Sequence, residues 1–300
     1  MLTQQIVNGL ALGAIYALIA LGYTLVYGIL AMINFAHSEV LMLGSFAALG
    51  LAAFAQAAFG TGPLALAGLF AAGMLAAGAL NAFIERFAYR PLRAVSRLAP
   101  LISAIGVSII LQNAVFLWVS DQSVAFPQPI AIRQIPLFGG AQISSLQAVT
   151  LAAALILMAL LHFVVEKTRI GKAMRACADD LEAAGLMGVD ADVVIAATFF
   201  IGGALGGAAG VLYSMSYGST KYNLGFLPGA KAFTAAVLGG IGNVRGAVLG
   251  GFILGFLEVL AAGYIPNGAQ WRDVIAFSVL ILVLLVRPSG LLGEKLAEKV

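Results

Sequence analysis

Long apolar runs recur along almost the whole chain, separated by short polar or glycine-rich segments. A helix that crosses a lipid bilayer needs about 20 predominantly apolar residues, and eight runs approach or exceed that length. A ninth run, 229–243, is apolar but shorter. The pattern predicts an all-α fold, a polytopic membrane helix bundle of about eight to nine spans that forms a single domain over residues 1–300. The eight runs are 6–30, 38–58, 63–84, 98–119, 146–165, 194–217, 246–263 and 271–286.

Basic residues gather at three places between or after these runs. Because cytoplasmic loops of membrane proteins are rich in Lys and Arg, we expect all three places, including the C-terminus, to lie in the cytoplasm. The loop 120–145 is then expected outside. The three groups are Arg86, Arg90, Arg93 and Arg97; Lys167, Arg169, Lys172 and Arg175; and Arg287, Lys295 and Lys299.

This orientation requires one more inward crossing near the end of the chain. The runs 194–217 and 246–263 both lead outward if 271–286 returns to the cytoplasm, and only 229–243 lies between them. As an α-helix this segment would span about 22 Å, which is short of the roughly 30 Å hydrocarbon core. We therefore expect a broken or partly extended crossing near 229–245, weakest at Gly239, Gly240 and Gly242.

The polar segment 31–39 (AMINFAHSE) interrupts the first two apolar runs. It is either a cytoplasmic turn, which would place the N-terminus outside, or a break within the membrane. Polar groups at membrane depth are costly and are usually functional, so we expect Asn34 and His37 to line a translocation path and Glu39 to cap the next helix. The full set predicted for this path is Asn34, His37, Glu39, Gly240, Gly242, Asn243 and Glu258.

Composition narrows the function classes. Hydrophobic residues make up 62% of the chain and charged residues 10%, whereas soluble proteins carry about 25% charged residues. The formal net charge is only +3, and no basic stripe suggests binding to nucleic acid. One cysteine and two histidines argue against an internal disulfide and against multi-histidine metal sites.

The polar segment 166–193 stands out in this apolar chain. Asp179 and Glu182 have the spacing of a helix capping box, and Gly185 and Gly188 are candidate helix ends. A short helix between them would carry a small apolar face formed by Leu181, Ala184 and Gly185. Such a helix could dock into a cleft of a cytoplasmic partner, or the segment could be a solvated connector.

The sequence EAAG at 182–185 resembles the EAA loop of the permease subunits of ABC importers, which forms the helix that contacts the ATPase subunits. Residues 8–46, 236–251 and 284–293 resemble LivH-type permeases of branched-chain amino-acid importers, and Ser38 stands where that family's NFAHGE pattern has Gly. The resemblance covers most of the chain in order. The residues that it implies for coupling to the ATPase are Arg169, Gly171, Arg175, Asp179, Glu182, Ala183, Ala184 and Gly185.

The resemblance implies a permease subunit of the inner membrane that works with a second related permease, two ATP-binding cassette subunits and a periplasmic binding protein. No cofactor is expected. The sequence GGIGNVRG at 239–246 lacks the GxGxxG spacing, and no P-loop precedes Lys172. We therefore expect the ATPase activity to reside on other chains, and this chain is not expected to be an enzyme.

Two alternatives stay open at this point. A stand-alone secondary transporter or channel would use intramembrane acids such as Glu39 and Glu258. A permease of the same family could instead carry urea or amides, because the binding protein sets most of the substrate choice.

Overall fold

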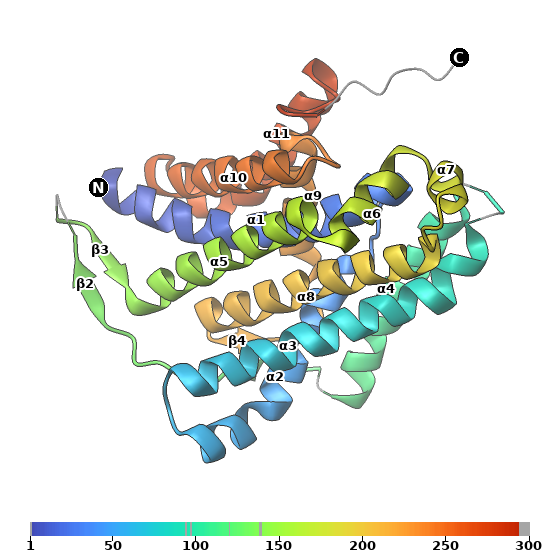
Figure 1. Cartoon of the computed structure of the whole chain (residues 1–300). Helices are drawn as coiled ribbons and strands as arrows, with labels where there is room; N and C mark the ends of the chain where they lie inside the picture. Colours follow the sequence, from blue (N-terminus) through green and yellow to red (C-terminus); the bar gives the residue numbers. More distant parts are fainter. Residues whose placement is uncertain (1, 94, 97, 120, 138–139, 294–300) are drawn as a thin grey trace.

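The computed structural model describes residues 2–93, 95–96, 98–119, 121–137 and 140–293, and this part of the chain is mainly helical (Figure 1). Two short antiparallel strand pairs accompany the helices. They are β1 (Val124–Ala125) with β4 (Ser219–Thr220), and β2 (Gln134–Pro136) with β3 (Gln142–Ser144). The helices are α1 (Leu2–Leu30), α2 (His37–Phe59), α3 (Pro63–Ile84), the π-helix η1 (Glu85–Tyr89), the 3-10 helix η2 (Arg90–Leu92), α4 (Ala99–Trp118), α5 (Ser145–Lys167), α6 (Arg169–Asp179), α7 (Leu181–Leu186), α8 (Ala191–Tyr217), α9 (Phe226–Gly239), α10 (Val244–Tyr264) and α11 (Gly268–Val286).

Within the described residues, eight helices are long and apolar enough to cross a membrane. They are α1, α2, α3 with its continuation to Leu92, α4, α5, α8, α10 and α11, and α9 is a shorter apolar helix. The predicted all-α bundle of about eight to nine spans is therefore confirmed.

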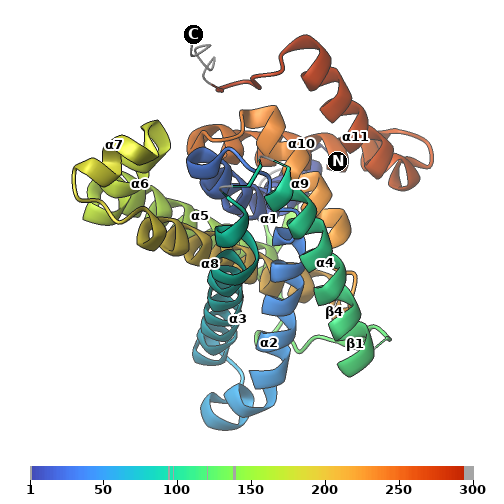
Figure 2. The same cartoon turned by 90° about the vertical axis from the view of Figure 1, so that its right-hand side faces the viewer.

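The first helix forms the centre of the bundle. The middle of α1 is almost wholly buried, and α1 packs against α5, α8, α9 and α10. By contrast, α4 and α11 bury few side chains and lie at the margin of the bundle (Figure 2). A central helix that is apolar all round is surrounded by protein, whereas the marginal helices present apolar side chains outward.

Glycines allow several of these helices to touch backbone to backbone. A Cβ added at Gly44 in α2 would lie 2.6 Å from Gly207 Cα in α8, and one added at Gly203 would lie 2.6 Å from the carbonyl oxygen of Ala77 in α3. Small residues at membrane helix contacts permit this close approach. The glycine ridge of α8 therefore holds α2 and α3 together.

The short strands β2 and β3 lie at one end of the bundle, and the helices that carry the basic groups lie at the other (Figure 1). The start of α1 lies at the end that carries β2 and β3, where the Gln4 side-chain amide donates to the carbonyl oxygen of Gln142 at 2.9 Å. The helices α6 and α7, together with η1 and η2, lie at the opposite end. The described basic residues of the first two groups are therefore at one end, and the start of α1 is at the other. Arg97, Lys295 and Lys299 lie outside the described residues.

The segment 31–36 separates α1 from α2 as predicted, and α2 resumes at His37. It reverses the chain direction, yet Asn34 and Ala36 are buried. His37 lies against α8, because a Cβ added at Gly206 would be 3.1 Å from His37 Cε1. The two interpretations of this segment thus combine: it is a turn, and part of it is buried in protein, the surrounding in which irregular backbone is tolerated at membrane depth.

The second expected break is smaller than predicted. Residues 226–239 form the regular helix α9, antiparallel to α10, so the expectation of an extended crossing is wrong for this stretch. The break is confined to 240–243, where Gly240 and Gly242 have φ of 106° and 97°, a backbone conformation that favours glycine. The 14 residues of α9 cover only about 21 Å, and irregular backbone before Phe226 precedes them.

The chain that follows α11 covers this second break. The backbone N–H groups of Leu291 and Leu292 donate to the carbonyl oxygens of Leu238 and Gly239, both at 2.9 Å. The Asn243 side-chain amide donates to the carbonyl oxygen of Leu292 at 2.9 Å. These bonds satisfy the last two carbonyl oxygens of α9, which have no partner further along the helix, and they hold the chain after α11 against the break.

Candidate functional site

A buried ion pair joins α9 to α10. Lys231 Nζ lies 2.9 Å from Glu258 Oε1, and the Tyr16 hydroxyl of α1 donates to Glu258 Oε2 at 2.7 Å. The hydropathy pattern predicted Glu258 as a residue of the path but did not indicate its partner. Lys231 was a missed signal, because a lone lysine within an apolar membrane segment is itself a marker of a functional or paired site.

The same lysine also reaches the marginal helix α11. Lys231 Nζ lies 2.7 Å from Asp273 Oδ1, and the Asp273 side chain is 50% exposed. One cation therefore balances two carboxylates and links α9, α10 and α11, with Tyr16 adding α1. Buried charges persist in proteins when they are paired and hydrogen-bonded in this way.

A polar network holds the break at 31–36. The Tyr89 hydroxyl donates to Asn34 Oδ1 at 2.7 Å, and the Asn34 side-chain amide donates to Asn81 Oδ1 at 3.2 Å. Asn81 in turn donates to the carbonyl oxygen of Phe199 at 2.7 Å. The break is thus tied to α3, η1 and α8 through hydrogen bonds, which are costly to break in an apolar surrounding.

His37 and Glu39 extend this region on the first turn of α2. Both are fully buried, and His37 packs edge-on against Tyr23 with ring centroids 4.8 Å apart. Glu39 Oε1 accepts a hydrogen bond from the Gln112 side-chain amide at 2.7 Å. The carboxylate is therefore engaged with α4, and the expected role of Glu39 as a helix cap is corrected: its partners are the side chains of Gln112, Ser108 and Ser38.

The predicted path residues form separate groups. Asn34, His37 and Glu39 lie together at the first break, whereas Gly240, Gly242 and Asn243 lie at the second, and Glu258 pairs with Lys231. None of the seven lines either of two cavities, of about 690 and 850 Å³, among the described residues. Gln112, the partner of Glu39, does line the larger cavity.

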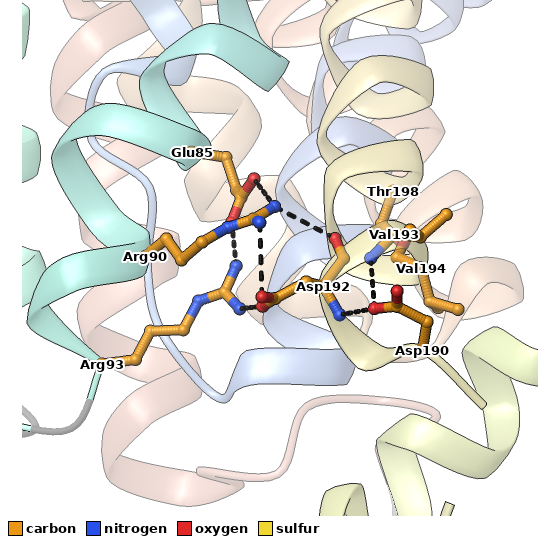
Figure 3. Close-up of polar contacts among 8 residues, drawn as sticks. All are labelled: Glu85, Arg90, Arg93, Asp190, Asp192, Val193, Val194 and Thr198. Carbon is orange, nitrogen blue, oxygen red and sulfur yellow. Dashed lines mark hydrogen bonds and ion pairs between the residues drawn. The ribbon is translucent and has the colours of Figure 1, made fainter. Parts of the chain in front are cut away.

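A second charge cluster lies at the end of the bundle that carries α6 and α7 (Figure 3). Glu85 is fully buried and pairs with Arg90 at 3.1 Å and with Arg93. Both arginines also contact Asp192 in the first turn of α8, at 3.3 and 3.2 Å. The cluster joins η1 and η2 to the start of α8. The clustering of basic residues predicted Arg90 and Arg93 as one group, but it did not indicate that Glu85 and Asp192 pair with them.

The segment 166–193 folds as two short helices, α6 and α7. Asp180 caps α7, since its Oδ1 accepts from the backbone N–H groups of Glu182 and Ala183 at 2.9 and 3.0 Å. The predicted capping box led by Asp179 is therefore wrong by one residue, because Asp179 ends α6. Gly185 lies inside α7, and Gly188 follows it with φ of 84°.

The exposed surface of α7 differs from the predicted apolar face. Ala184 is buried with Met174, Cys177 and Val194, so its side chain points into the protein. Gly171 is also buried against the last turn of α5. Among the residues expected to couple, the exposed ones are Arg169, Arg175, Asp179, Glu182, Ala183 and Gly185.

Two large apolar side chains complete that surface and were not predicted. Leu186 and Met187 at the end of α7 are 90% and 85% exposed. Exposed large apolar side chains that stand next to each other are typical of protein contacts. The end of α7 is therefore the part of this segment most suited to bind a partner.

Comparisons with known proteins agree on one family. The family model for the permease component of the branched-chain amino acid transport system matches residues 5–284. The chain is 48% identical over 303 residues to the high-affinity branched-chain amino acid transport system permease protein BraD of Pseudomonas aeruginosa, which covers 99% of this chain and 97% of that protein. It is 46% identical over 309 residues to the corresponding LivH protein of Escherichia coli K12, again with 99% and 97% coverage.

A more distant relative carries a different name. The autoinducer 2 import system permease protein LsrC of Salmonella paratyphi B is 30% identical over 63% of this chain and 54% of that protein. The near relatives and the family model both extend over almost all of the helical bundle described above. This multi-pass membrane protein therefore belongs to the family of branched-chain amino acid transport system permease components.

Proposed function

We propose that this protein is the transmembrane permease subunit of an ATP-driven importer that carries branched-chain amino acids across the inner membrane. The observation that carries the proposal is the near-full-length identity of 46–48% to high-affinity branched-chain amino acid permeases. The proposed partners are a second homologous permease, two ATP-binding cassette subunits and a periplasmic binding protein. The C-terminus and the segment 166–193 face the cytoplasm in this arrangement.

The cytoplasmic contact is assigned to α7. Its end exposes Leu186 and Met187, while Ala184 faces the cluster with Val194 at the start of α8. Asp192 on the same turn pairs with Arg93, which pairs with Glu85. A displacement of α7 by the ATPase would therefore reach α8 and η1 through packed side chains and charged contacts.

The paired state of Glu258 removes one of the two acids that a stand-alone secondary transporter would use. An ion-coupled carrier needs acids that bind and release a cation, whereas Glu258 already has Lys231 and Tyr16 as partners.

Reconstitution tests the proposal directly. Proteoliposomes with both permeases, both ATPases and the binding protein are expected to accumulate radiolabelled leucine only when ATP is enclosed in the vesicle, on the side of the ATPase subunits. Leucine uptake by this chain alone, driven by an ion gradient, would contradict it.

Topology gives a first prediction. In a Cys177→Ser background, a cysteine at Lys172 is expected to react with a membrane-impermeant maleimide only after the cells are opened, and a cysteine at Gln128 is expected to react in intact cells. The reason is that basic clusters are retained in the cytoplasm. Cys177 itself is buried, so its replacement removes a weak background. Labelling of position 172 in intact cells would contradict the predicted topology.

Coupling gives a second prediction. Gly185→Trp is expected to leave the bundle folded, because a Cβ at Gly185 meets nothing within 4 Å among the described residues. It is expected to lower ATPase binding or ATP-dependent uptake at least about tenfold, the effect of about 1.4 kcal/mol at an interface. The measurements are co-purification with the ATPase and uptake in proteoliposomes.

Gly50→Trp is the matched control for this change. Gly50 in α2 also has nothing within 4 Å of an added Cβ among the described residues, and it lies far from α7 in sequence. Normal assembly and uptake are expected for it. Equal ATPase binding and equal uptake for the two variants would contradict the assignment of α7 to the contact with the ATPase.

A further inference from the structure

The larger cavity lies where α4, the end of α8 and the segment 219–228 meet. Its volume is about 850 Å³, which falls in the range of about 300–1,000 Å³ typical of small-molecule sites. Its walls combine an amide, a cation and several apolar side chains. Among the lining residues are Gln112, Lys221, Tyr213, Tyr222, Leu224 and Phe226.

A buried carboxylate lies directly behind one wall of this cavity. Gln112 lines the cavity and donates to Glu39 Oε1 at 2.7 Å. The other wall approaches the same place, because a Cβ added at Gly225 would lie 3.3 Å from the backbone nitrogen of Glu39. Glu39 is therefore one side chain away from the cavity, between α4 and the 219–228 segment.

One of the two oxygens of the Glu39 carboxylate accepts no hydrogen bond from the described residues. Glu39 is fully buried, and its Oε2 has no hydrogen-bond partner within the described part of the chain. An unsatisfied buried acceptor costs free energy, and more so when it is charged. A buried polar atom without a partner is explained by a bound water or ion or by a functional role. The position of Glu39 Oε2 next to the cavity fits a cationic ligand.

The opposite charge is available at the same cavity. Lys221 is an exposed lining residue and follows β4, the strand that pairs with β1 at the outer end of the bundle. A free amino acid with an apolar side chain carries an ammonium group, a carboxylate and a hydrocarbon part. A site for such a molecule needs an anion for the ammonium group, a cation for the carboxylate and apolar walls for the hydrocarbon part.

We propose that this cavity is a transit binding site for a zwitterionic hydrophobic amino acid, with Lys221 receiving the carboxylate and Glu39, reached by displacement of the Gln112 amide, receiving the ammonium group. Tyr213, Tyr222 and Phe226 surround the hydrocarbon side chain. The inference rests on the proposed function and adds to it the residues that recognise the substrate within the membrane subunit.

The test uses the complete reconstituted importer with three variants of this chain. Glu39→Gln and Lys221→Met are each expected to reduce ATP-dependent leucine uptake at least about tenfold, the equivalent of 1.4 kcal/mol for a lost charge contact. ATP hydrolysis stimulated by the loaded binding protein is expected to stay within about twofold, because neither residue lies in the 166–193 segment. Arg133→Gln removes an exposed cation that lines neither of the two cavities and lies outside the 166–193 segment, and it is the control.

A binding measurement separates recognition from transport. The assembled permease–ATPase complex without the binding protein is expected to bind tritiated leucine, and 3-methylbutylamine is expected to compete in the Lys221→Met variant but not in Glu39→Gln. Absence of leucine uptake by the unaltered importer would refute the proposed function. Normal uptake by Lys221→Met, whose exposed position spares the fold, would refute the transit site alone, whatever the stability of Glu39→Gln.

Discussion

Replacing Lys231 with Met is expected to destabilise the folded subunit by about 3–5 kcal/mol, the cost of leaving a buried charge without its partner. Lys231 holds Glu258 at 2.9 Å inside the bundle, and Glu258 is 3% exposed. Without the lysine, the carboxylate keeps only the Tyr16 hydroxyl, and α11 loses the contact through Asp273. Unfolding of the purified protein in detergent, followed by intrinsic fluorescence, measures the loss.

Two companion variants identify the cause. The double variant Lys231→Met with Glu258→Gln is expected to recover part of the loss, because it removes both buried charges together. Asp273→Asn is expected to cost about 1 kcal/mol or less, since its side chain is half exposed and such ion pairs are weak. A Lys231→Met protein as stable as the unaltered one would show that the ion pair does not hold α9 to α10.

Replacing Gly207 with Ala is expected to destabilise the bundle by about 1–3 kcal/mol, the usual cost of overpacking a close-packed interior. The added Cβ would overlap the carbonyl oxygen of Gly73 and lie 2.7 Å from Ala77 Cβ, both on α3. The neighbouring backbone cannot rotate out of the way as a flexible side chain can. The axes of α3 and α8 must therefore separate, and α2 must separate with them because Gly44 contacts Gly207.

Gly106→Ala is the matched control, since a Cβ at Gly106 in α4 meets nothing within 4 Å among the described residues. It is expected to be neutral or slightly stabilising, because Ala is favoured over Gly in a helix by up to about 1 kcal/mol. Thermal unfolding of both variants under one detergent condition makes the comparison. Equal midpoints would mean that α3 and α8 tolerate a wider spacing.

The polar side chains explain how the irregular segments survive inside an apolar bundle. The break at 31–36 is held by Tyr89 and Asn81, and the break at 240–243 is held by the chain from Leu291 to Leu292. Ser38, where the resembling family pattern has Gly, is accommodated because Gly225 and Gly229 pack against it. The position lies in the first turn of α2, where a serine needs no unusual backbone conformation.

The class of fold, a count of about eight to nine spans and the clustering of the basic residues followed from the sequence alone. These features depend on the length and hydropathy of each segment, and the bilayer demands about 20 apolar residues per helix wherever the helix lies. Parity also predicted a further crossing between α8 and α10, and the structure places the short apolar helix α9 there. The EAAG sequence located the segment of α7, although the cap proved to be Asp180 instead of Asp179.

The contacts between polar residues could not be predicted from the sequence and are seen in the three-dimensional structure. Lys231 and Glu258 lie on separate helices, as do Glu39 and Gln112. Arg93 pairs with both Glu85 and Asp192, although the two acids are more than a hundred residues apart in the chain. Each pair depends on how the helices rotate and approach one another, and that is set by the backbone contacts at glycines such as Gly207 and Gly203. Hydropathy predicts that a helix crosses the membrane, but it does not predict which face of the helix packs against which neighbour.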